Sequence, residues 1–434
     1  MQFERCNLSM NPIANLSAVE LAARRDELQK AYDGYKAQNL KLDMSRGKPS
    51  VGQLELTLDM NTAVDFAADF KAEDGTDTRN YGILCGLPET RRLFAEILGV
   101  SADNVIVGGN ASLTLMYDYL STAYMRGVCG GTPWAKQDGV KFLCPVPGYD
   151  RHFSITEFLG VEMINVPMTA EGPDMALVEE LVKDPAVKGM WCVPMYSNPS
   201  GITYSDETVR RLAALRPAAA DFRIMWDNAY CLHHIRDTHD RLLNIYAEAE
   251  KCGNEDIVLM FTSTSKISFP GAGVSALAAS PRNLADIKAR MTVQTIGYDK
   301  MNMLRHNRYF GNLAGIEAHM EKHAEFLRPR FDAVDQALTA NLTGKGIAEW
   351  TRPNGGYFVS VDLLPGTAKE TVRLLKEAGV VLTGAGATYP YGKDPADSNL
   401  RIAPSFPPVE ELVLAMELFC ICAELAAVNK LLAG

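Results

Sequence analysis

Short runs of apolar residues alternate with longer amphipathic stretches through most of the chain. The apolar runs have the length and composition of buried strands. They lie at Asn104–Val107, Val140–Cys144, Glu162–Val166, Gly189–Val193, Arg223–Asp227, Ile257–Phe261 and Val274–Ala279. Amphipathic segments of helical length, such as Asp174–Leu181 and Asp206–Leu215, separate several of them. Because strands that alternate with helices pair in parallel, this pattern predicts an α/β core with a mostly parallel central sheet flanked by helices.

The two ends of the chain predict a second, smaller unit. Ser17–Lys36 has helical periodicity, with Ser17 as candidate N-cap and Glu20 placed to complete a capping box. The further predicted elements are a strand at Leu40–Met44, long helices over 282–342, strands at Tyr357–Asp362 and Val380–Thr383, a helix at Thr367–Ala378 and a closing helix from Val409. We therefore expect residues 61–335 to form the large domain. Segments 1–60 and 336–434 would together form a small α+β domain.

The composition limits the classes of protein to which this chain can belong. With 434 residues, 47% hydrophobic and 22% charged, the chain is typical of a globular protein. A formal net charge of −10 disfavours nucleic acid as a partner. No apolar run approaches the roughly 20 residues that span a bilayer, and the N-terminus has no signal-peptide pattern, so we expect no membrane association. The nine scattered cysteines predict buried free thiols and a cytosolic location.

The stretch Ile257–Ser275 contains the first indication of chemistry. Lys266 follows a predicted buried strand and the hydroxyl-rich run Thr262-Ser263-Thr264-Ser265. Burial at such a position would lower the pKa of the lysine and leave an amine able to attack a carbonyl or aldehyde. Taken alone, an ordinary loop lysine is the more common interpretation.

Polar residues follow the other predicted strands, where the functional loops of parallel sheets gather. They are Gly109-Asn110-Ala111-Ser112, then Tyr149 and His152, Asn198 in an Asn-Pro-x-Gly turn, Asp227 with Tyr230, and Arg401 in an apolar run. Glycines and a hydroxyl ahead of a helix favour an anion such as phosphate. A buried aspartate needs a cation, and a buried arginine needs a carboxylate.

One ligand satisfies all of these residues. It would offer an aldehyde to Lys266, a phosphate to 109–112 and Ser263, and a flat ring to Tyr149. It would also offer a ring nitrogen to Asp227 and a phenolic oxygen to Asn198 and Tyr230. Pyridoxal 5′-phosphate (PLP) has these groups.

The order of these motifs resembles the fold-type I PLP-dependent aminotransferases (class I/II), from about Asp43 to Pro404. It is most similar to the aspartate aminotransferase branch that carries Lys-Ile-Ser-Phe-Pro-Gly-Ala-Gly and Gly-Ala-Thr-Tyr-Pro-Tyr-Gly. The resemblance implies that Lys266 holds the cofactor as a Schiff base and moves the reacting proton. Asp227 would keep the ring nitrogen protonated with support from His152, and Tyr149 would stack on the ring. The implied phosphate-binding residues are Gly109, Asn110, Ala111, Ser112, Ser263 and Ser265.

The resemblance also implies a substrate site shared between two subunits. Asn198 and Tyr230 would hydrogen-bond the ring oxygen. Arg401 would bind the substrate α-carboxylate, with the Gly47 loop closing over it. Tyr81 would reach the phosphate of the neighbouring subunit, so that the active unit would be a homodimer.

Three pairs of residues test how far this resemblance extends. The family usually has an arginine that contacts the phosphate seven or eight residues after the lysine, and Gly273 and Val274 stand there instead. Lys300 is the candidate cation for the distal carboxylate of a dicarboxylic substrate. An equally good interpretation is that Lys300 and Arg305 are only surface residues of a solvated helix. His319 and His323 have metal-ligand spacing on one helix face, but their charged surroundings predict surface residues and no metal.

We therefore predict a cytosolic PLP-dependent aminotransferase, most simply one for aspartate and 2-oxoglutarate with ping-pong kinetics. Transamination of aromatic or alanine-like substrates and β-elimination remain open, because the sequence separates reactions of one cofactor poorly. A PLP-sensing transcription regulator would need an added DNA-binding module, for which only about forty residues precede the core. A non-catalytic scaffold is disfavoured because Lys266, Asp227 and Arg401 are all present.

Overall fold

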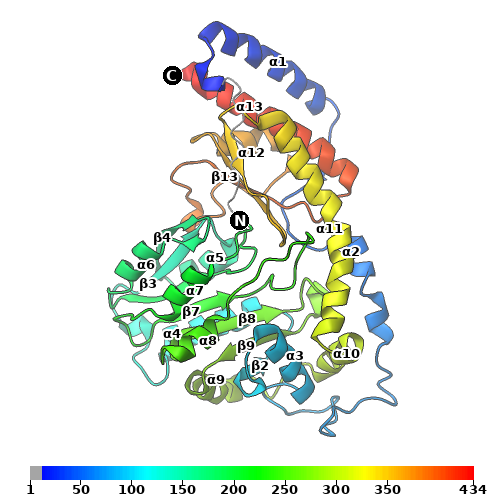
Figure 1. Ribbon diagram of the computed structural model, residues 1–434, viewed down its shortest axis with the longest axis vertical. Helices are drawn as coiled ribbons and strands as arrows, with labels where there is room; N and C mark the ends of the chain where they lie inside the picture. Colours follow the sequence, from blue (N-terminus) through cyan, green and yellow to red (C-terminus); the bar gives the residue numbers. More distant parts are fainter. Residues whose placement is uncertain (1–11) are drawn as a thin grey trace.

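The computed structural model describes residues 12–434. Residues 1–11, with Cys6 and the start of the predicted segment 1–60, lie outside the described residues. The chain folds into a large part around an eight-stranded sheet and a smaller part built from both ends (Figure 1).

The central sheet has the strand order β2-β9-β8-β7-β6-β3-β4-β5. Its strands are β2 (Val105–Val107), β3 (Lys141–Val146), β4 (Glu162–Thr169), β5 (Gly172–Pro173), β6 (Val187–Cys192), β7 (Arg223–Asp227), β8 (Val258–Ser263) and β9 (Ser275–Ala279). The five strands β4, β3, β6, β7 and β8 pair in parallel, whereas β9 is antiparallel to both of its neighbours and β5 is antiparallel to β4. The predicted mostly parallel sheet is confirmed.

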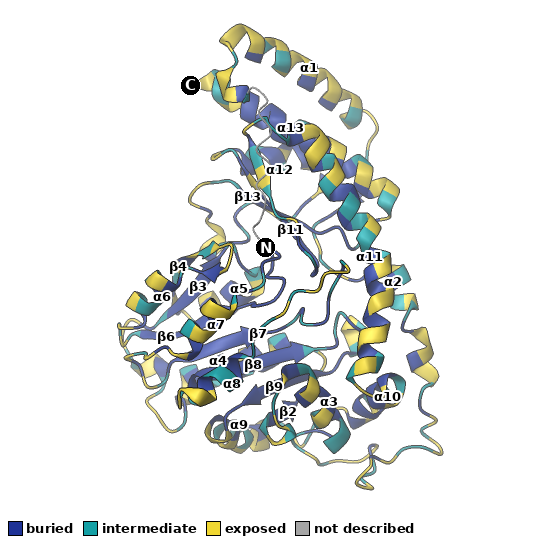
Figure 2. Cartoon of the chain, in the orientation of Figure 1, coloured by how far each residue is buried: buried dark blue, intermediate teal, exposed yellow. Residues whose placement is uncertain are grey.

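Helices cover this sheet because each connection between parallel strands must cross one of its faces. The helices of the large part are α2 (Val51–Glu55), α3 (Pro88–Leu98), α4 (Ser112–Arg126), α5 (Asp150–Phe158), α6 (Met175–Leu181), α7 (Asp206–Ala213), α8 (Ile245–Lys251), α9 (Pro281–Gln294) and α10 (Lys300–Phe310). The inner strands are almost entirely buried, whereas β4 near one edge alternates buried and exposed residues, and the helices alternate buried and exposed faces (Figure 2). This is the pattern of a sheet covered on both faces.

The smaller part combines the two ends of the chain. Its elements are α1 (Ala18–Lys36), β1 (Leu42–Asp43), β10 (Ala348–Trp350), β11 (Val359–Leu363), α12 (Ala368–Glu377), β12 (Val380–Val381), β13 (Asn399–Ile402) and α13 (Val409–Ala433). A three-stranded antiparallel sheet, β10-β11-β13, and the short parallel pair β1-β12 pack with the helices. The helix α11 (Leu313–Leu342) extends from α10 in the large part to α13 in the small one (Figure 1). The predicted boundary at residue 335 therefore falls inside α11.

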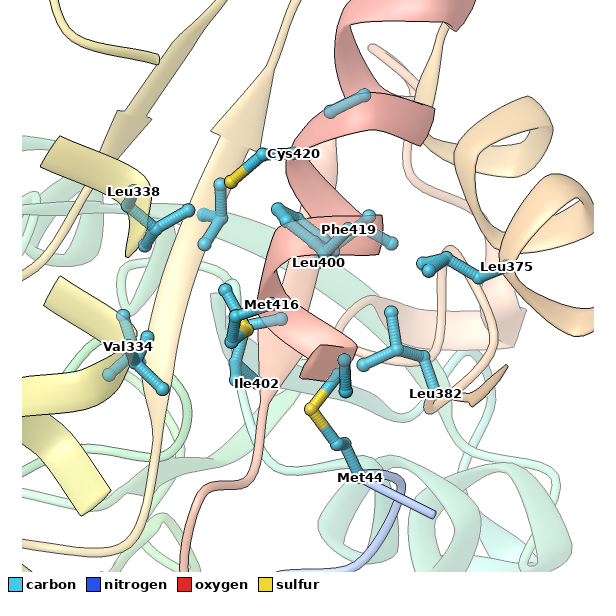
Figure 3. Packing of buried hydrophobic residues seen from close by; sticks show 14 of the residues in the cluster. Met44, Val334, Leu338, Leu375, Leu382, Leu400, Ile402, Met416, Phe419 and Cys420 are labelled. Atoms are coloured by element: carbon cyan, nitrogen blue, oxygen red, sulfur yellow. The ribbon is translucent and has the colours of Figure 1, made fainter. Parts of the chain in front are cut away.

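Apolar packing and one ion cluster hold the two chain ends together. Side chains from α11, α12, β13 and α13 interlock around Met416 and Phe419, both fully buried (Figure 3). At one end of this core Arg24 of α1 donates to both carboxylate oxygens of the buried Glu424 at 2.7 and 2.9 Å. Lys345 approaches the same carboxylate at 2.6 Å. The predicted capping box of α1 is also present, with Ser17 and Glu20 bonded reciprocally.

Some local predictions were wrong. The strand expected over Leu40–Met44 is only Leu42–Asp43, because its partner β12 offers two residues. The predicted buried state holds for Cys144, Cys192, Cys420 and Cys422, whereas Cys252 is exposed. The eight cysteines among residues 12–434 are free. Within that range, no helix has the length and apolar character that crossing a membrane requires.

Candidate active site

The carboxyl ends of β3, β6, β7 and β8 bring most of the predicted site residues to one edge of the sheet. Asp227 is the last residue of β7, and Ser263 is the last residue of β8. Tyr149 and His152 follow β3, and Asn198 follows β6. Arg401 reaches the same edge from β13 of the small part, since it bonds to Asn198.

Asp227 and His152 form a buried pair. His152 Nε2 lies 3.0 Å from Asp227 Oδ2, and both residues are almost completely buried. The His152 ring stacks on Trp191 at 4.2 Å between centroids with an interplanar angle of 7°, which fixes the direction of Nε2. The other carboxylate oxygen, Asp227 Oδ1, is buried and has no hydrogen-bond partner among residues 12–434. A buried carboxylate oxygen without a partner is costly, so this atom calls for a donor from a bound molecule.

Lys266 lies beside two tyrosines. Its Nζ is 5.0 Å from the centroid of the Tyr230 ring. Burial raises the pKa of Tyr149 to about 12, and the nearby charge of Lys266 opposes this rise. Burial, followed by the charge of Asp227, raises the pKa of Tyr230. Lys266, Tyr149 and Tyr230, which were predicted as the amine, the stacking platform and the phenol, therefore lie together.

The glycine-rich turn before α4 forms an open helix N-terminus. Ala111 is the N-cap residue, and no side-chain capping bond is present there in the described structure. The hydroxyl of Ser265 donates to Asn110 O at 2.6 Å, and the hydroxyl of Ser263 donates to Ser265 at 3.1 Å. Free backbone N–H groups, two serine hydroxyls and the helix dipole favour an anion at this position.

The packing of Gly273 explains why no arginine stands there. A Cβ atom on Gly273 would lie 2.9 Å from Asn110 O and 3.1 Å from the backbone nitrogen of Ser265. The next residue, Val274, is buried in the sheet core and its N–H donates to Thr264 Oγ1 at 2.9 Å. Neither position has space for a guanidinium.

Arg401 is a buried cation with several partners. Its Nη1 donates to Asp150 Oδ1 at 2.9 Å and to Asn198 Oδ1 at 3.2 Å. Its Nη2 donates to Thr383 Oγ1 at 3.3 Å. Its Nε is buried and finds no partner in the described part of the chain.

The Gly47 loop lies next to this arginine. A Cβ atom on Gly47 would overlap the ring of Phe358, and that ring faces the Arg401 guanidinium at 4.8 Å. Thr383, which accepts from Arg401, also donates to Ser45 O at 2.7 Å. The predicted substrate-binding loop is therefore close to the predicted carboxylate-binding residue.

Two further predicted site residues, Lys300 and Tyr81, lie next to each other. Lys300 Nζ donates to Gly82 O at 3.0 Å, directly beside Tyr81. Lys300 is buried, so the interpretation of a solvated helix position was wrong for this residue. Burial lowers the pKa of Lys300. Tyr81 is 83% exposed.

The surface assignment of His319 and His323 was also wrong. Both are buried, and His319 Nε2 lies 3.0 Å from Ile267 O, the residue after Lys266. His323 lies 3.2 Å from His319 and 3.1 Å from the Gln53 amide. No group of three or more possible metal ligands occurs among residues 12–434. The pair belongs to the interior under the lysine loop.

Sequence reasoning missed three residues of this region. Asp150 and Thr383 contact Arg401, and His233 is buried with no partner for either ring nitrogen within the described structure. Asp150 directly follows Tyr149 in a stretch already assigned to the site, so a signal for it was available. Nothing in their local sequence distinguishes Thr383 and His233.

Known proteins resemble this chain along its whole length. The family described as aspartate amino-transferase matches residues 16–434. An aspartate aminotransferase of Corynebacterium glutamicum is 47% identical over 421 residues, which is 97% of each chain. A solved structure of an aspartate transaminase from C. glutamicum superposes with a TM-score of 0.95 at 46% identity, and covers 98% of this chain and 100% of that one. An α-aminoadipate aminotransferase of Thermus thermophilus, in complex with N-(5′-phosphopyridoxyl)-L-leucine, shares the fold with a TM-score of 0.73 at 20% identity, covering 97% of this chain and 96% of that one.

Proposed function

The chain belongs to the aspartate aminotransferase family, and we propose from this premise that it transfers the amino group of aspartate to 2-oxoglutarate with bound PLP. The chain is an aminotransferase, and the family implies the cofactor. The observation that carries the proposal for the site is the Asp227–His152 pair. It leaves one buried carboxylate oxygen without a donor at the place where a protonated ring nitrogen is needed.

The donor set around the site fits PLP. Asp227 would hold the ring nitrogen, Tyr149 would cover the ring, and Asn198 with Tyr230 would bind the ring oxygen. The open N-terminus of α4 would hold the phosphate, with the residues Gly109, Asn110, Ala111, Ser112, Ser263 and Ser265. When bound, the cofactor supplies an electron-withdrawing ring that stabilises negative charge at the substrate Cα.

The chain itself supplies charge balance and proton transfer. A carboxylate held by the buried His152 remains close to the ring and favours the protonated ring nitrogen. Lys266 Nζ would hold the cofactor through its aldehyde and, once released, carry the proton from the substrate Cα. The centroid of the Tyr230 ring lies 5.0 Å from this amine. Tyr230 would keep the amine within reach of the cofactor ring.

Two cations would recognise the substrate. Arg401 would bind the α-carboxylate, and the Gly47 loop would exclude water above it. Lys300 would bind the distal carboxylate of aspartate or 2-oxoglutarate. A dicarboxylic substrate therefore suits the site better than an aromatic one.

The placement of Lys300 and Tyr81 supports a homodimer with shared sites. Lys300 donates to the carbonyl of Gly82, the residue that follows Tyr81. Ile83 and Ile296, the sequence neighbours of Gly82 and Gly297, are exposed apolar side chains. The backbones of Gly82 and Gly297 are so close that a Cβ on Gly297 would lie 2.5 Å from Gly82 O. Exposed apolar side chains of this kind are typical of a subunit interface.

The eight cysteines among residues 12–434 are all free. Free thiols support the proposed cytosolic location.

The visible absorption spectrum of the purified protein tests the proposal. We expect a band from lysine-bound cofactor that shifts to the pyridoxamine form when aspartate is added. Lys266→Ala should reduce turnover by about a thousandfold or more and remove this band, while circular dichroism remains native. Retained multiple turnover in Lys266→Ala would refute the role of this residue.

A panel of amino donors with keto-acid detection separates the rival reactions. If an aromatic amino acid or alanine shifts the band and aspartate does not, the cofactor assignment stands and the substrate assignment is wrong. Release of ammonia with pyruvate from a β-substituted donor would instead indicate β-elimination.

A further inference from the structure

Arg401 already has a carboxylate partner from its own chain. Asp150 Oδ1 lies 2.9 Å from Arg401 Nη1. The arginine comes from β13 of the small part, and the aspartate is the first residue of α5 in the large part. The negative charge of Asp150 also contributes to raising the pKa of both Tyr149 and Tyr230, after burial and other nearby charges.

The two members of this ion pair differ in their access to water. The Arg401 side chain is 7% exposed, whereas the Asp150 side chain is 32% exposed. A buried guanidinium that loses its carboxylate is strongly destabilised, because its charge is neither hydrated nor paired. A carboxylate at the rim can turn into solvent at a much lower cost. Asp150 is also the first residue of a helix, where the helix dipole stabilises its charge without Arg401.

The other nitrogens of Arg401 show how a ligand can enter. Nη1 is shared by Asp150 and Asn198, Nη2 has one long bond to Thr383, and Nε has no partner among residues 12–434. A ligand carboxylate binds a guanidinium best through two parallel N–H bonds. Whichever pair of nitrogens it takes, it must displace Asp150 or lie within a few ångströms of a like charge.

We propose that Asp150 is an internal counter-ion that Arg401 exchanges for the carboxylate of the substrate. This inference rests on the proposed role of Arg401 in substrate binding. The exchange keeps the buried arginine paired at every stage. It also makes every carboxylate ligand compete with Asp150, so simple monovalent anions bind the site weakly.

Isothermal titration calorimetry on the purified holoenzyme tests this exchange with two probes, acetate and succinate. Asp150→Asn removes the competing charge and keeps the size of the side chain. We expect its dissociation constants for both probes to fall by about tenfold, the change that about 1.4 kcal/mol produces. Asp237→Asn is the matched control. It also removes a carboxylate that faces an arginine, Arg328, but Asp237 is 99% exposed, and its affinities should remain at wild-type values.

The outcomes separate this inference from the proposed function. Unchanged or weaker binding of acetate by Asp150→Asn would overturn it, because a residue that merely positions Arg401 gives that result. Asp150→Ser, with a melting temperature measured for each variant, repeats the comparison if the asparagine variant folds poorly. Should wild-type protein bind acetate but not succinate, the dicarboxylate substrate is wrong, and the acetate comparison still decides the role of Asp150.

Discussion

Gly273 illustrates how a single position can exclude a side chain that a family usually has. Its α-carbon faces the backbone of Asn110 and Ser265, the residues that frame the proposed phosphate site. We predict that Gly273→Ala forces these two backbones apart. It should destabilise the protein by about 1–3 kcal/mol, the typical cost of overpacking. The affinity for PLP, measured by fluorescence titration of protein freed of cofactor, should fall by about tenfold.

A neighbouring glycine provides the matched control for this prediction. A Cβ on Gly271 would meet no atom of the described structure within 4 Å. Gly271→Ala should therefore leave stability and cofactor affinity nearly unchanged. Equal effects of the two substitutions would mean that general stiffening of the loop, and not the contact at Gly273, decides cofactor binding.

Single site residues were predictable from sequence where a charged side chain stands in an apolar run and its burial would cost free energy. Asp227 at the end of an apolar strand and Arg401 inside one each need a partner, which made them visible without a structure. The position of Asp150 next to Tyr149 was a signal for the site, but its ion pair could not be predicted, because its partner lies 251 positions away. His319 and His323 were misjudged for the same reason. Their charged neighbours point outward from α11, while the histidines point toward the lysine loop.

Buried histidines on α11 make stability depend on pH. Burial, followed by the neighbouring His319, lowers the pKa of His323 from 6.5 to about 3. Below pH 6.5 the unfolded chain takes up a proton at this residue and the folded chain does not, so folding stability falls as pH falls. The loss is about 1.4 kcal/mol per pH unit until the folded pKa is reached.

We predict that His323→Gln weakens this acid sensitivity. Between pH 6 and pH 4 its unfolding free energy should fall by about 2 kcal/mol less than that of the wild type. Urea titrations at fixed protein concentration and several pH values measure the difference. His239→Gln, at a histidine whose side chain is 44% exposed, serves as the control. Parallel pH profiles of wild type and His323→Gln would show that other groups govern acid stability.

Whole elements were predictable where one strong pattern defines them. The parallel strands read as continuous apolar runs, and the Ser17–Glu20 capping box marked the start of α1. The two-residue β5 and the three-residue β10 carry too little pattern to be found. Their pairing depends on the neighbouring strands and not on their own residues.

At the scale of the whole molecule, we propose that each site draws residues from two subunits. Lys300 lies beside Gly82, the residue that follows Tyr81. The sequence alone could place Lys300 only by resemblance. Its buried bond to Gly82 O shows that it is held in position, away from solvent. A residue fixed in this way can serve a partner without reorganising.

Hybrid dimers decide whether Lys300 acts across the interface. Lys266→Ala should be inactive, and Lys300→Met should lose most activity toward aspartate. In a hybrid of the two, the site that retains Lys266 receives an intact Lys300 from its partner. Hybrids isolated with two affinity tags should therefore regain about half of the wild-type turnover, because one of two symmetric sites is complete. If Lys300 acted within its own subunit, the same hybrid would contain no complete site, and its activity would not exceed the average of the two parents.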